Sequence, residues 1–404
     1  MKTLALPVLS AVAAVLSSGE THAQYFEARN AAMGGVGVAS SDYLAAGWAN
    51  PALLTRRGES DDFGILLPAF GARFFAETGL LEDIDDFVDA YDALEANPSA
   101  DPNDYADLAN QLGALSNRGL DAELGAGLMF AAPSESLGWA LHVRNYADLQ
   151  ALTQIDDQDV DAIRDALANN LGTLPTLASE VRLIGVNVTE VGLSLATKLD
   201  LGGFALAVGA TPKFQRIDTY NYSVNANNFE IDDFDDDRYR NDDSGFNVDV
   251  GAAFDTPVGI TVGLMVRDLI ARTYQTEAVG VGPDSFTYEI GPQATLGAAW
   301  TFGMLTLAAD ADLLVRERFD DAVLANSVEG LADDIQLVRV GAELDLASWI
   351  QLRGGYQFDI EDNLDGVITA GLGISPFDVI RLDLSASYID EESFGFAAQF
   401  GLQF

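Results

Sequence analysis

The end of the chain constrains its fold more than any other stretch. Between positions 394 and 404, every even position holds phenylalanine, leucine or alanine, and the chain ends on Phe404. The odd positions hold glycine, alanine and glutamine. Because successive side chains of a strand point to opposite faces, this stretch predicts a β-strand with one aromatic, apolar face and one small, polar face.

The same alternation recurs along most of the chain. Between Val338 and Leu346, for example, apolar residues alternate with Arg339, Glu343 and Asp345. In this way we predict fourteen strands, an even number, as bacterial membrane barrels have. They span residues 61–76, 121–132, 136–147, 180–199, 203–224, 243–255, 258–270, 286–301, 303–317, 335–347, 349–360, 365–375, 378–390 and 393–404. The pattern alone also fits a soluble all-β protein, which would bury the apolar faces.

Residues 1–23 have the features of a secretory signal. Lys2 precedes an apolar run from Leu4 to Leu16, and the small residues Thr21 and Ala23 predict cleavage before Gln24. A membrane anchor is the alternative for this segment. The rest of the sequence has no apolar run long enough for a membrane helix, so a membrane-spanning form must be a closed barrel. We therefore predict an all-β protein, a 14-stranded antiparallel transmembrane β-barrel over residues 61–404.

Composition excludes several classes of function. The formal net charge of −42 argues against nucleic-acid binding, which needs lysine and arginine to neutralise phosphates. Disorder does not fit, because 49% of the residues are hydrophobic and they alternate. The absence of cysteine excludes disulfides and thiolate metal sites.

Residues 24–60 precede the first predicted strand and carry two motifs. These are Ala-Ala-Met-Gly-Gly-Val-Gly-Val-Ala-Ser at 31–40 and Trp-Ala-Asn-Pro-Ala-Leu at 48–53. Both resemble the N-terminal region of the FadL-like (OmpP/TodX-type) superfamily of outer-membrane barrels, where such motifs lie in a plug inside the barrel. The stretch Arg29 to Met33 also resembles the plasmid-transfer TraF-like branch. The resemblance implies that 24–60 form an N-terminal plug, with the motif residues Met33, Gly34, Gly35, Gly37, Asn50, Pro51 and Ala52.

A glycine-rich run such as Gly34 to Gly37 can also bind phosphate. Here no strand–loop–helix context and no P-loop lysine follow it. We therefore expect no cofactor.

The last strand resembles the closing strand of outer-membrane barrels, in which a terminal phenylalanine is an assembly signal. The resemblance implies that Phe400, Leu402 and Phe404 are read by the barrel assembly machinery. It also implies an outer surface in contact with outer-membrane lipid and lipopolysaccharide in a Gram-negative bacterium.

Lengths of the connections predict an orientation. If the N-terminus is periplasmic, the periplasmic turns are short, at 133–136, 200–203, 256–259, 302–303, 347–348 and 375–378. The longer links, at 77–120, 148–179, 225–242, 271–285 and 318–334, then face outwards, which is the usual asymmetry. Two of these extracellular loops, 77–120 and 148–179, have apolar residues at helical spacing, and Asp101-Pro102 predicts a helix start. Such helices could form a lid that packs its own apolar faces, or a landing groove for a hydrophobic ligand.

Charged residues fall at the inward positions of many predicted strands. They can pair across neighbouring strands as a closed network around the plug, or they can form a selectivity ring for polar solutes. The candidates are Arg144, Lys198, Arg267, Asp310, Asp312, Arg339, Glu343, Arg353, Arg381 and Asp383.

Other candidate chemistry is sparse. The acidic run Asp232, Asp233, Asp235, Asp236 and Asp237 could bind Ca²⁺ but lacks EF-hand spacing, so solvated charge is the alternative. His142 is the single histidine after the predicted signal, and Arg144, not a serine, occupies the next inward position. We therefore expect no enzyme.

Three prolines lie within predicted strands. Because proline cannot donate to a strand ladder, we expect a bulge or a break at Pro68, Pro212 and Pro292.

The resemblance implies passive uptake of hydrophobic small molecules, fatty-acid-like or aromatic, through an outer-membrane channel. The alternative is a TraF-like barrel without transport, which serves conjugative transfer or secretion as a structural or partner-docking protein.

Overall fold

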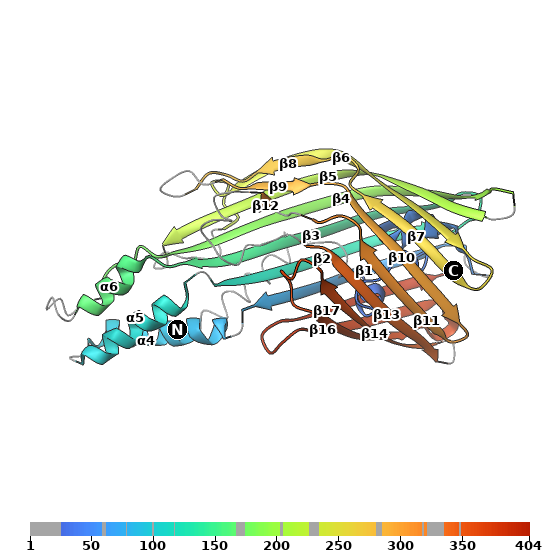
Figure 1. Ribbon diagram of the computed structural model, residues 1–404. Coiled ribbons are helices and arrows are strands. Elements are labelled where there is room, and N and C mark those ends of the chain that lie inside the picture. The colour runs from blue at the N-terminus through green and yellow to red at the C-terminus, as the bar shows by residue number, and fades with distance from the viewer. Residues whose placement is uncertain are drawn as a thin grey trace.

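The fold is a closed antiparallel β-barrel, seen from the side in Figure 1. The computed structural model describes residues 26–58, 62–77, 79–98, 101–116, 118–166, 174–202, 205–225, 234–279, 285–316, 319–320, 335–346 and 349–404. The predicted signal, residues 1–23, lies outside them.

Within the described part of the chain, fourteen strands form the barrel, each beside its predecessor in the order of the chain, and β1 pairs with β17 to close it. The strands are β1 (Gly64–Ala76), β2 (Gly119–Ala132), β3 (Gly138–Gln154), β4 (Glu180–Asp200), β5 (Ala205–Asn225), β6 (Arg240–Asp255), β7 (Ile260–Arg267), β10 (Gln293–Phe302), β11 (Leu305–Asp312), β13 (Leu337–Leu346), β14 (Ile350–Asp359), β15 (Val367–Ile374), β16 (Ile380–Tyr388) and β17 (Phe394–Gln403). The predicted fold class is confirmed.

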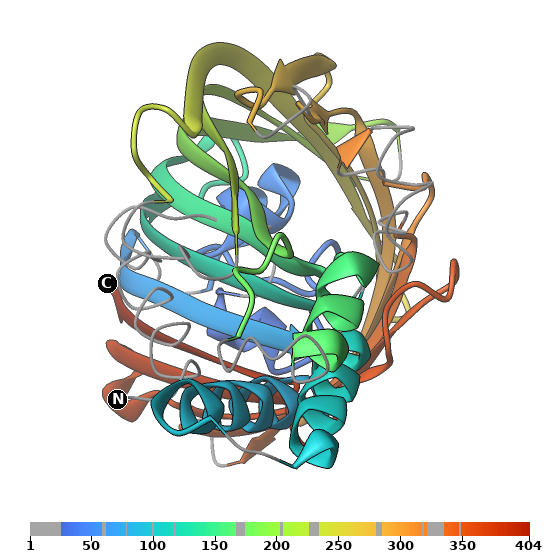
Figure 2. The same cartoon turned by 90° about the vertical axis from the view of Figure 1, so that its left-hand side faces the viewer.

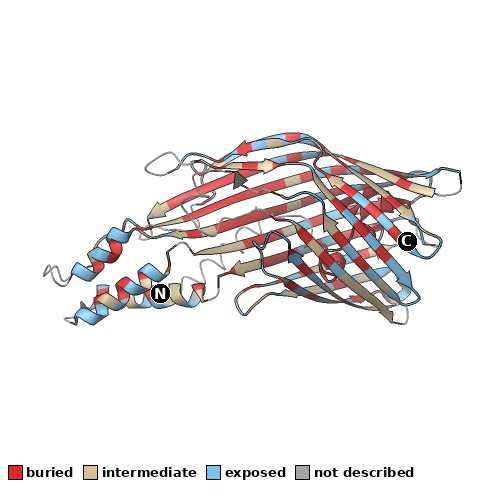
Figure 3. Ribbon diagram, viewed as in Figure 1, coloured by how far each residue is buried: buried red, intermediate tan, exposed pale blue. Residues whose placement is uncertain are grey.

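The barrel turns its apolar side chains outwards. On β16, Leu382 and Leu384 are exposed while Asp383 between them is fully buried. Figure 3 shows the same alternation of exposed and buried residues along many of the other strands, whereas the halves of β3 and β4 near the helices are buried on both faces. This is the reverse of a soluble β-protein and is the arrangement of a barrel that faces lipid. Among the described residues, no helix is both long and apolar enough to span a bilayer.

Of the three prolines for which we predict a bulge or a break, two interrupt their strands, and the prediction for Pro212 is wrong. The predicted strand 286–301 is divided at Pro292 into β9 (Thr287–Ile290) and β10. β9 leaves the barrel and pairs with β8 (Arg272–Gln275) and β12 (Phe319–Asp320) in a small sheet that was not predicted. At Pro68, the register of β1 shifts between Leu66 and Ala69, as expected for a bulge. Pro212 leaves the β4–β5 register unchanged on either side of it.

Two long links carry helices at one end of the barrel (Figure 1). They are α4 (Leu80–Ala96) and α5 (Pro102–Ala114) between β1 and β2, and α6 (Asp157–Ala166) between β3 and β4. Asp101 caps α5 by accepting a hydrogen bond from the backbone of Asn103, as its sequence predicts. The apolar faces are buried against one another, with Leu108, Leu112 and Ile163 in one cluster. This packing favours the lid over the landing groove.

The other end of the barrel has the short turns, and the first described residues lie on that side. Figure 2 shows them in blue within the ring of strands. They form α2 (Ala28–Ala31), α3 (Ala46–Ala49) and the 3-10 helix η1 (Pro51–Thr55), while a second short 3-10 helix, η4 (Pro376–Asp378), makes the β15–β16 turn. That the short-turn end faces the periplasm stays a prediction.

Candidate functional site

The N-terminal segment, residues 26–58, occupies the lumen at the short-turn end. Phe26, Leu44 and Leu53 are buried in one cluster with inward-facing Leu66 and Met129 of the wall. The turn between β2 and β3 donates a backbone hydrogen bond of 3.0 Å from Ser134 to Leu54. Arg56 forms an ion pair of 2.7 Å with Asp255 at the end of β6. The segment is therefore packed and tethered on several sides of the barrel.

The glycine motif allows the backbone of the segment to touch the wall. Gly34 and Gly35 have φ values of +75° and +85°, which favour glycine. The Gly34 amide donates to Thr369 Oγ1 on β15 at 2.9 Å. A Cβ atom on Gly34 would lie 3.0 Å from the backbone nitrogen of Tyr356, and one on Gly341 would lie 2.7 Å from Met33 Cβ. Glycines on both surfaces are thus required for this contact.

The Asn50-Pro51-Ala52 motif makes a capped bend against β5 and β6. The Asn50 side chain accepts from the Ala52 amide at 3.1 Å and begins η1, with Pro51 at its first position. Its Nδ2 donates to Ala252 O on β6 at 3.1 Å. A Cβ on Gly209 of β5 would lie 2.6 Å from the Pro51 carbonyl carbon, so the wall is again glycine where the motif meets it.

Many of the predicted lumen charges meet in a first group, which we name the α2 cluster. Glu343 accepts hydrogen bonds from Arg29 of α2 at 3.1 Å and from Arg353 at 2.6 Å. Asp383 accepts from Arg353 at 2.6 Å and from Arg381 at 2.9 Å. Arg381 also contacts Asp42 of the N-terminal segment. The α2 cluster thus consists of Arg29, Asp42, Glu343, Arg353, Arg381 and Asp383.

A second group, the β4–β5 cluster, centres on a lysine that sequence analysis missed. Lys213 Nζ lies 3.0 Å from Glu190, 3.0 Å from Asp249 and 2.8 Å from Asp268. Of the predicted residues, Arg144 belongs here and contacts Glu190. Lys213 precedes the exposed Phe214, and this alternation was the signal that could have identified it.

Lys198 does not join these clusters. It pairs at 3.0 Å with Glu135 in the β2–β3 turn, and the Glu135 side chain is largely exposed. The prediction that places Lys198 in the lumen network is therefore wrong. The residue lies where β4 leaves the barrel, so its side chain reaches the turn instead.

The remaining predicted charges lie on β7, β11 and β13. Arg339 donates to both carboxylate oxygens of Asp312, at 2.9 and 3.0 Å. Asp310 accepts from the amides of Gly37 and Val38 at 2.7 and 3.0 Å. Arg267 donates to the carbonyl oxygens of Trp48 and Ala49 at 3.1 and 3.3 Å. Asp310 and Arg267 thus bind the backbone of the N-terminal segment and not an opposite charge.

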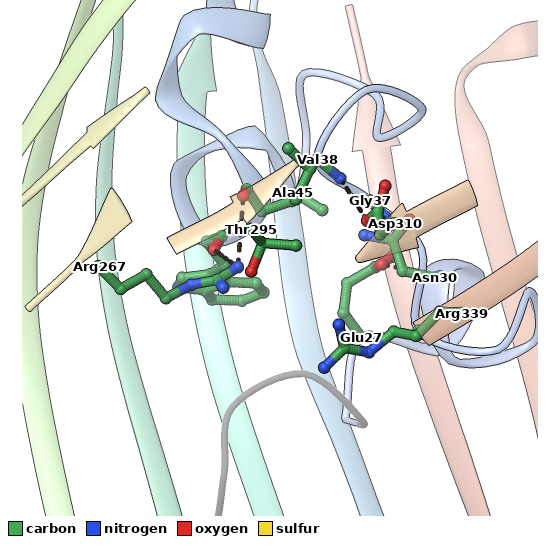
Figure 4. Close-up of a pocket in the computed structure, with 12 residues that line it drawn as sticks. Glu27, Asn30, Gly37, Val38, Ala45, Arg267, Thr295, Asp310 and Arg339 are labelled. Atoms are coloured by element: carbon green, nitrogen blue, oxygen red, sulfur yellow. Dashed lines mark hydrogen bonds between the residues drawn. The ribbon is translucent and has the colours of Figure 1, made fainter. Parts of the chain in front are cut away.

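A cavity lies between the N-terminal segment and this part of the wall (Figure 4). Its volume, measured as the space open to the centre of a water-sized sphere, is about 20 Å³. Glu27, Gly37 and Trp48 line it from the segment. The barrel contributes Arg267, Thr295, Asp310 and Arg339.

Beyond the segment, the small sheet covers an apolar part of the inner wall. Tyr288 and Ile290 of β9 are buried against Val186, Val188 and Ile217 of β4 and β5. These wall residues share the inward face with Glu190 and Lys213, because they stand at even separations from them along the strands. The lumen therefore changes from charged near the segment to apolar towards the helical end.

The predicted cation site lacks support in the described residues. Asp232 and Asp233 lie outside them, and Asp235, Asp236 and Asp237 are exposed. Asp236 pairs with Arg238 at 3.2 Å, and Asp237 pairs with Arg240 at 3.3 Å. Among the described residues, no group of three or more histidine or carboxylate side chains could hold a metal ion.

The terminal residues close the barrel. The ring of Phe404 stacks on that of Phe63 with centroids 4.9 Å apart, and the Phe404 amide donates to Phe63 O at 2.9 Å. Phe400 is exposed on the outer surface. That Phe400, Leu402 and Phe404 form an assembly signal stays a prediction.

Glu27 is a buried acid in the N-terminal segment. Its Oε2 accepts from the Asn30 amide at 2.9 Å and caps α2, while Oε1 has no hydrogen-bond partner. Burial, together with the charge of Asp42, raises the pKa of Glu27 to about 7. The protonated form is therefore favoured in the folded state, and the stability it contributes is present below pH 4.5 and is lost as pH rises through 7.

We expect Glu27→Gln to remove this pH dependence. The amide keeps an oxygen for the α2 cap and does not ionise. Melting temperatures of the two proteins should be similar at pH 5, and the variant should be the more stable at pH 8. If the melting temperatures of the two proteins changed in parallel between pH 5 and pH 8, a buried acid that titrates near neutrality would be contradicted.

Two adjacent glycines of β14 test the contact with the wall. Gly355 faces the Met33–Gly34 backbone, whereas a Cβ on Gly354 would meet a nearest atom 3.7 Å away. We expect Gly355→Val to destabilise the folded barrel by about 1–3 kcal/mol through overpacking and to expose the segment to protease. Gly354→Val is the matched control. Equal behaviour of the two variants in thermal unfolding and limited proteolysis would refute a tight contact.

Comparison with solved structures identifies proteins of similar fold. A toluene transporter, TbuX, from Ralstonia pickettii is 12% identical, with a TM-score of 0.52 over 96% of this chain and 100% of that one. A FadL homologue from Pseudomonas aeruginosa is 10% identical, with a TM-score of 0.53 over 96% and 100%. The deltaS2S3 mutant of TodX, a monoaromatic hydrocarbon channel, is 12% identical, with a TM-score of 0.51 over 95% and 99%. At these identities the likeness shows the fold, and it confirms the FadL-like resemblance at that level.

Of these three, TbuX is described as a transporter and the TodX mutant as a channel. A search of curated proteins finds no match. A family profile described as "F plasmid transfer operon, TraF, protein" matches residues 47–312, from α3 to the end of β11. Because the match spans more than half of the sequence, the chain belongs to this TraF family.

Proposed function

We propose that the protein is an outer-membrane channel for passive uptake of hydrophobic small molecules, fatty-acid-like or aromatic, and that its N-terminal segment is a plug. The observation that carries this proposal is the occupied lumen. A fourteen-stranded barrel is wide enough to approach the water-filled porins. Here the segment and the paired charges fill the short-turn end, and an apolar wall patch lies beyond them. A cargo that need not travel with water suits such a lumen.

The solved structures with this fold support the proposal, since those compared above are described as a toluene transporter, a FadL homologue and a hydrocarbon channel. In this proposal the lipid-facing surface contacts outer-membrane lipid and lipopolysaccharide. The short-turn end and the N-terminus are then periplasmic.

A second candidate function follows from the family. Its description refers to a plasmid transfer operon, which favours a structural or partner-docking barrel in conjugation or secretion. The buried ion pairs that tie Arg29 and Asp42 to the wall suit this candidate too, because they fix the position of the segment against the barrel. The two candidates differ in whether any solute crosses the barrel.

Conductance tests the plug. We expect the intact protein to conduct little in a planar bilayer, and a variant that lacks residues 24–60 but keeps the signal to conduct steadily. A variant that lacks α4, which lies outside the lumen, is the control and should stay closed. Large, stable conductance from the intact protein would show a general porin and would refute the plug.

Uptake separates the two functions. Cells that produce the protein should accumulate radiolabelled toluene or a labelled fatty acid faster than cells that produce a variant whose lumen is blocked by an inward-facing charged side chain. Ile217→Arg, which places a charge on the buried apolar wall, is that block, and Arg216→Gln on the adjacent exposed position is its control. Equal rates in producing and non-producing cells would favour the structural, partner-docking function.

A further inference from the structure

The cavity in Figure 4 is bordered by a buried arginine whose charge is not balanced by an ion pair. Arg267 is 9% exposed. Its Nη2 reaches the carbonyl oxygens of Trp48 and Ala49, but its Nε has no hydrogen-bond partner. Within the described residues, no carboxylate lies within 4.0 Å of this guanidinium, although the other buried lumen cations described above lie that close to a carboxylate.

The two carboxylates whose charges act most strongly on Arg267 are committed to other cations. The charges that act on it are those of Arg144, Asp249, Asp312 and Arg339. Asp249 pairs with Lys213 at 3.0 Å, and Asp312 is held by both terminal nitrogens of Arg339. Taking a charge out of water is costly unless it is paired. Two neutral carbonyl groups offset this cost only in part.

A second residue that lines the same cavity also has a donor without a partner. Trp48 is 5% exposed, and its indole Nε1 makes no hydrogen bond. Indole and guanidinium nitrogens donate and cannot accept. The two donors come from different parts of the chain, α3 of the N-terminal segment and the end of β7. Together they require an acceptor.

Two lining residues also have an acceptor atom without a hydrogen-bond partner, Glu27 at Oε1 and Asp310 at Oδ1. Figure 4 shows Glu27, Asp310 and Arg339 on one side of the cavity and Arg267 on the other. The burial that raises the pKa of Glu27 to about 7 keeps much of it neutral near neutral pH. The negative charge of Asp310 is spread over two backbone amides through its other oxygen. The donors at Arg267 and Trp48 therefore form the positive side of the cavity.

We propose that a small monovalent anion, of the size of chloride or formate, binds between Arg267 Nε and Trp48 Nε1. It would balance the buried guanidinium and accept the indole hydrogen. Because Trp48 lies on α3 and Arg267 on β7, the anion also holds the N-terminal segment against the wall. Water could accept the same two hydrogen bonds but would leave the charge unbalanced.

Bromide tests the site directly, because it replaces chloride and scatters X-rays anomalously. Crystals of the full-length mature protein grown with sodium bromide should show an anomalous peak within hydrogen-bond distance of Arg267 Nε and Trp48 Nε1. Arg267→Gln crystals should lack it. Absence of the peak in the unmodified protein, or its persistence in the variant, overturns the proposal. An ion that appears only at exposed arginines also overturns it.

Solution stability gives a second test and separates the candidate anions. Thermal unfolding is compared in sodium chloride, sodium formate and sodium gluconate at equal ionic strength, since gluconate is much larger than the other two anions. We expect a higher melting temperature in chloride or formate, with the larger gain identifying the preferred anion. The gain should be lost in Arg267→Gln and reduced in Trp48→Phe, and it should be kept in Arg216→Gln, which alters a half-exposed arginine of the outer surface. A gain of equal size in all four proteins, or none in the unmodified protein, overturns the proposal.

If Arg267→Gln does not fold, Trp48→Phe keeps the test decisive. It removes one donor and preserves the aromatic contact with Phe26, whose ring centroid lies 5.1 Å away. The chloride-dependent gain must then fall relative to the unmodified protein. An unchanged gain overturns the proposal.

Discussion

The interior of this barrel is strongly charged near the N-terminal segment, and the rest of the structure depends on how its buried charges are paired. The outer surface takes the apolar residues, so charged and amide side chains must point inwards. There, each charge needs a partner, because a buried unpaired charge is strongly destabilising. The N-terminal segment supplies part of this pairing. Arg29 and Asp42 reach Glu343 and Arg381 of the wall, and backbone amides of the segment reach Asp310.

Close backbone contact is the second requirement for this arrangement. The segment meets the wall where the wall carries glycine, at positions such as Gly209, Gly341 and Gly355. A side chain at these points would push the segment away and would separate the ion pairs as well. Packing and charge pairing therefore support each other, and neither effect by itself would fix the position of the N-terminal segment.

This arrangement bears on both proposed functions. A segment held by buried ion pairs on several walls costs much to displace, so a hydrophobic cargo must pass beside it or leave the lumen before reaching it. The same rigidity gives a docking barrel a fixed end surface. The apolar patch under the small sheet, which packs against β9, favours the first of these proposed functions.

The sequence alone determined the strands, their number in the barrel and the face of most side chains. The side-chain period of a strand is two, so alternation such as that around Asp383 and Arg339 can be read locally. Helix starts are local too, and Asp101-Pro102 was recognised for that reason. Pro292 also had a local effect, which divided one predicted strand.

Only the tertiary structure decided which inward charges meet. In the α2 cluster, Arg29 and its partner Glu343 are more than three hundred residues apart in the sequence. They come together only because the barrel closes and its strands are staggered. Lys198 and Lys213 show this well. They lie on the neighbouring strands β4 and β5. The Lys198 side chain pairs with Glu135 in an exposed turn, whereas the Lys213 side chain is surrounded by three carboxylates. The two lysines differ in their position along the barrel axis, and the alternation of the sequence does not encode this position.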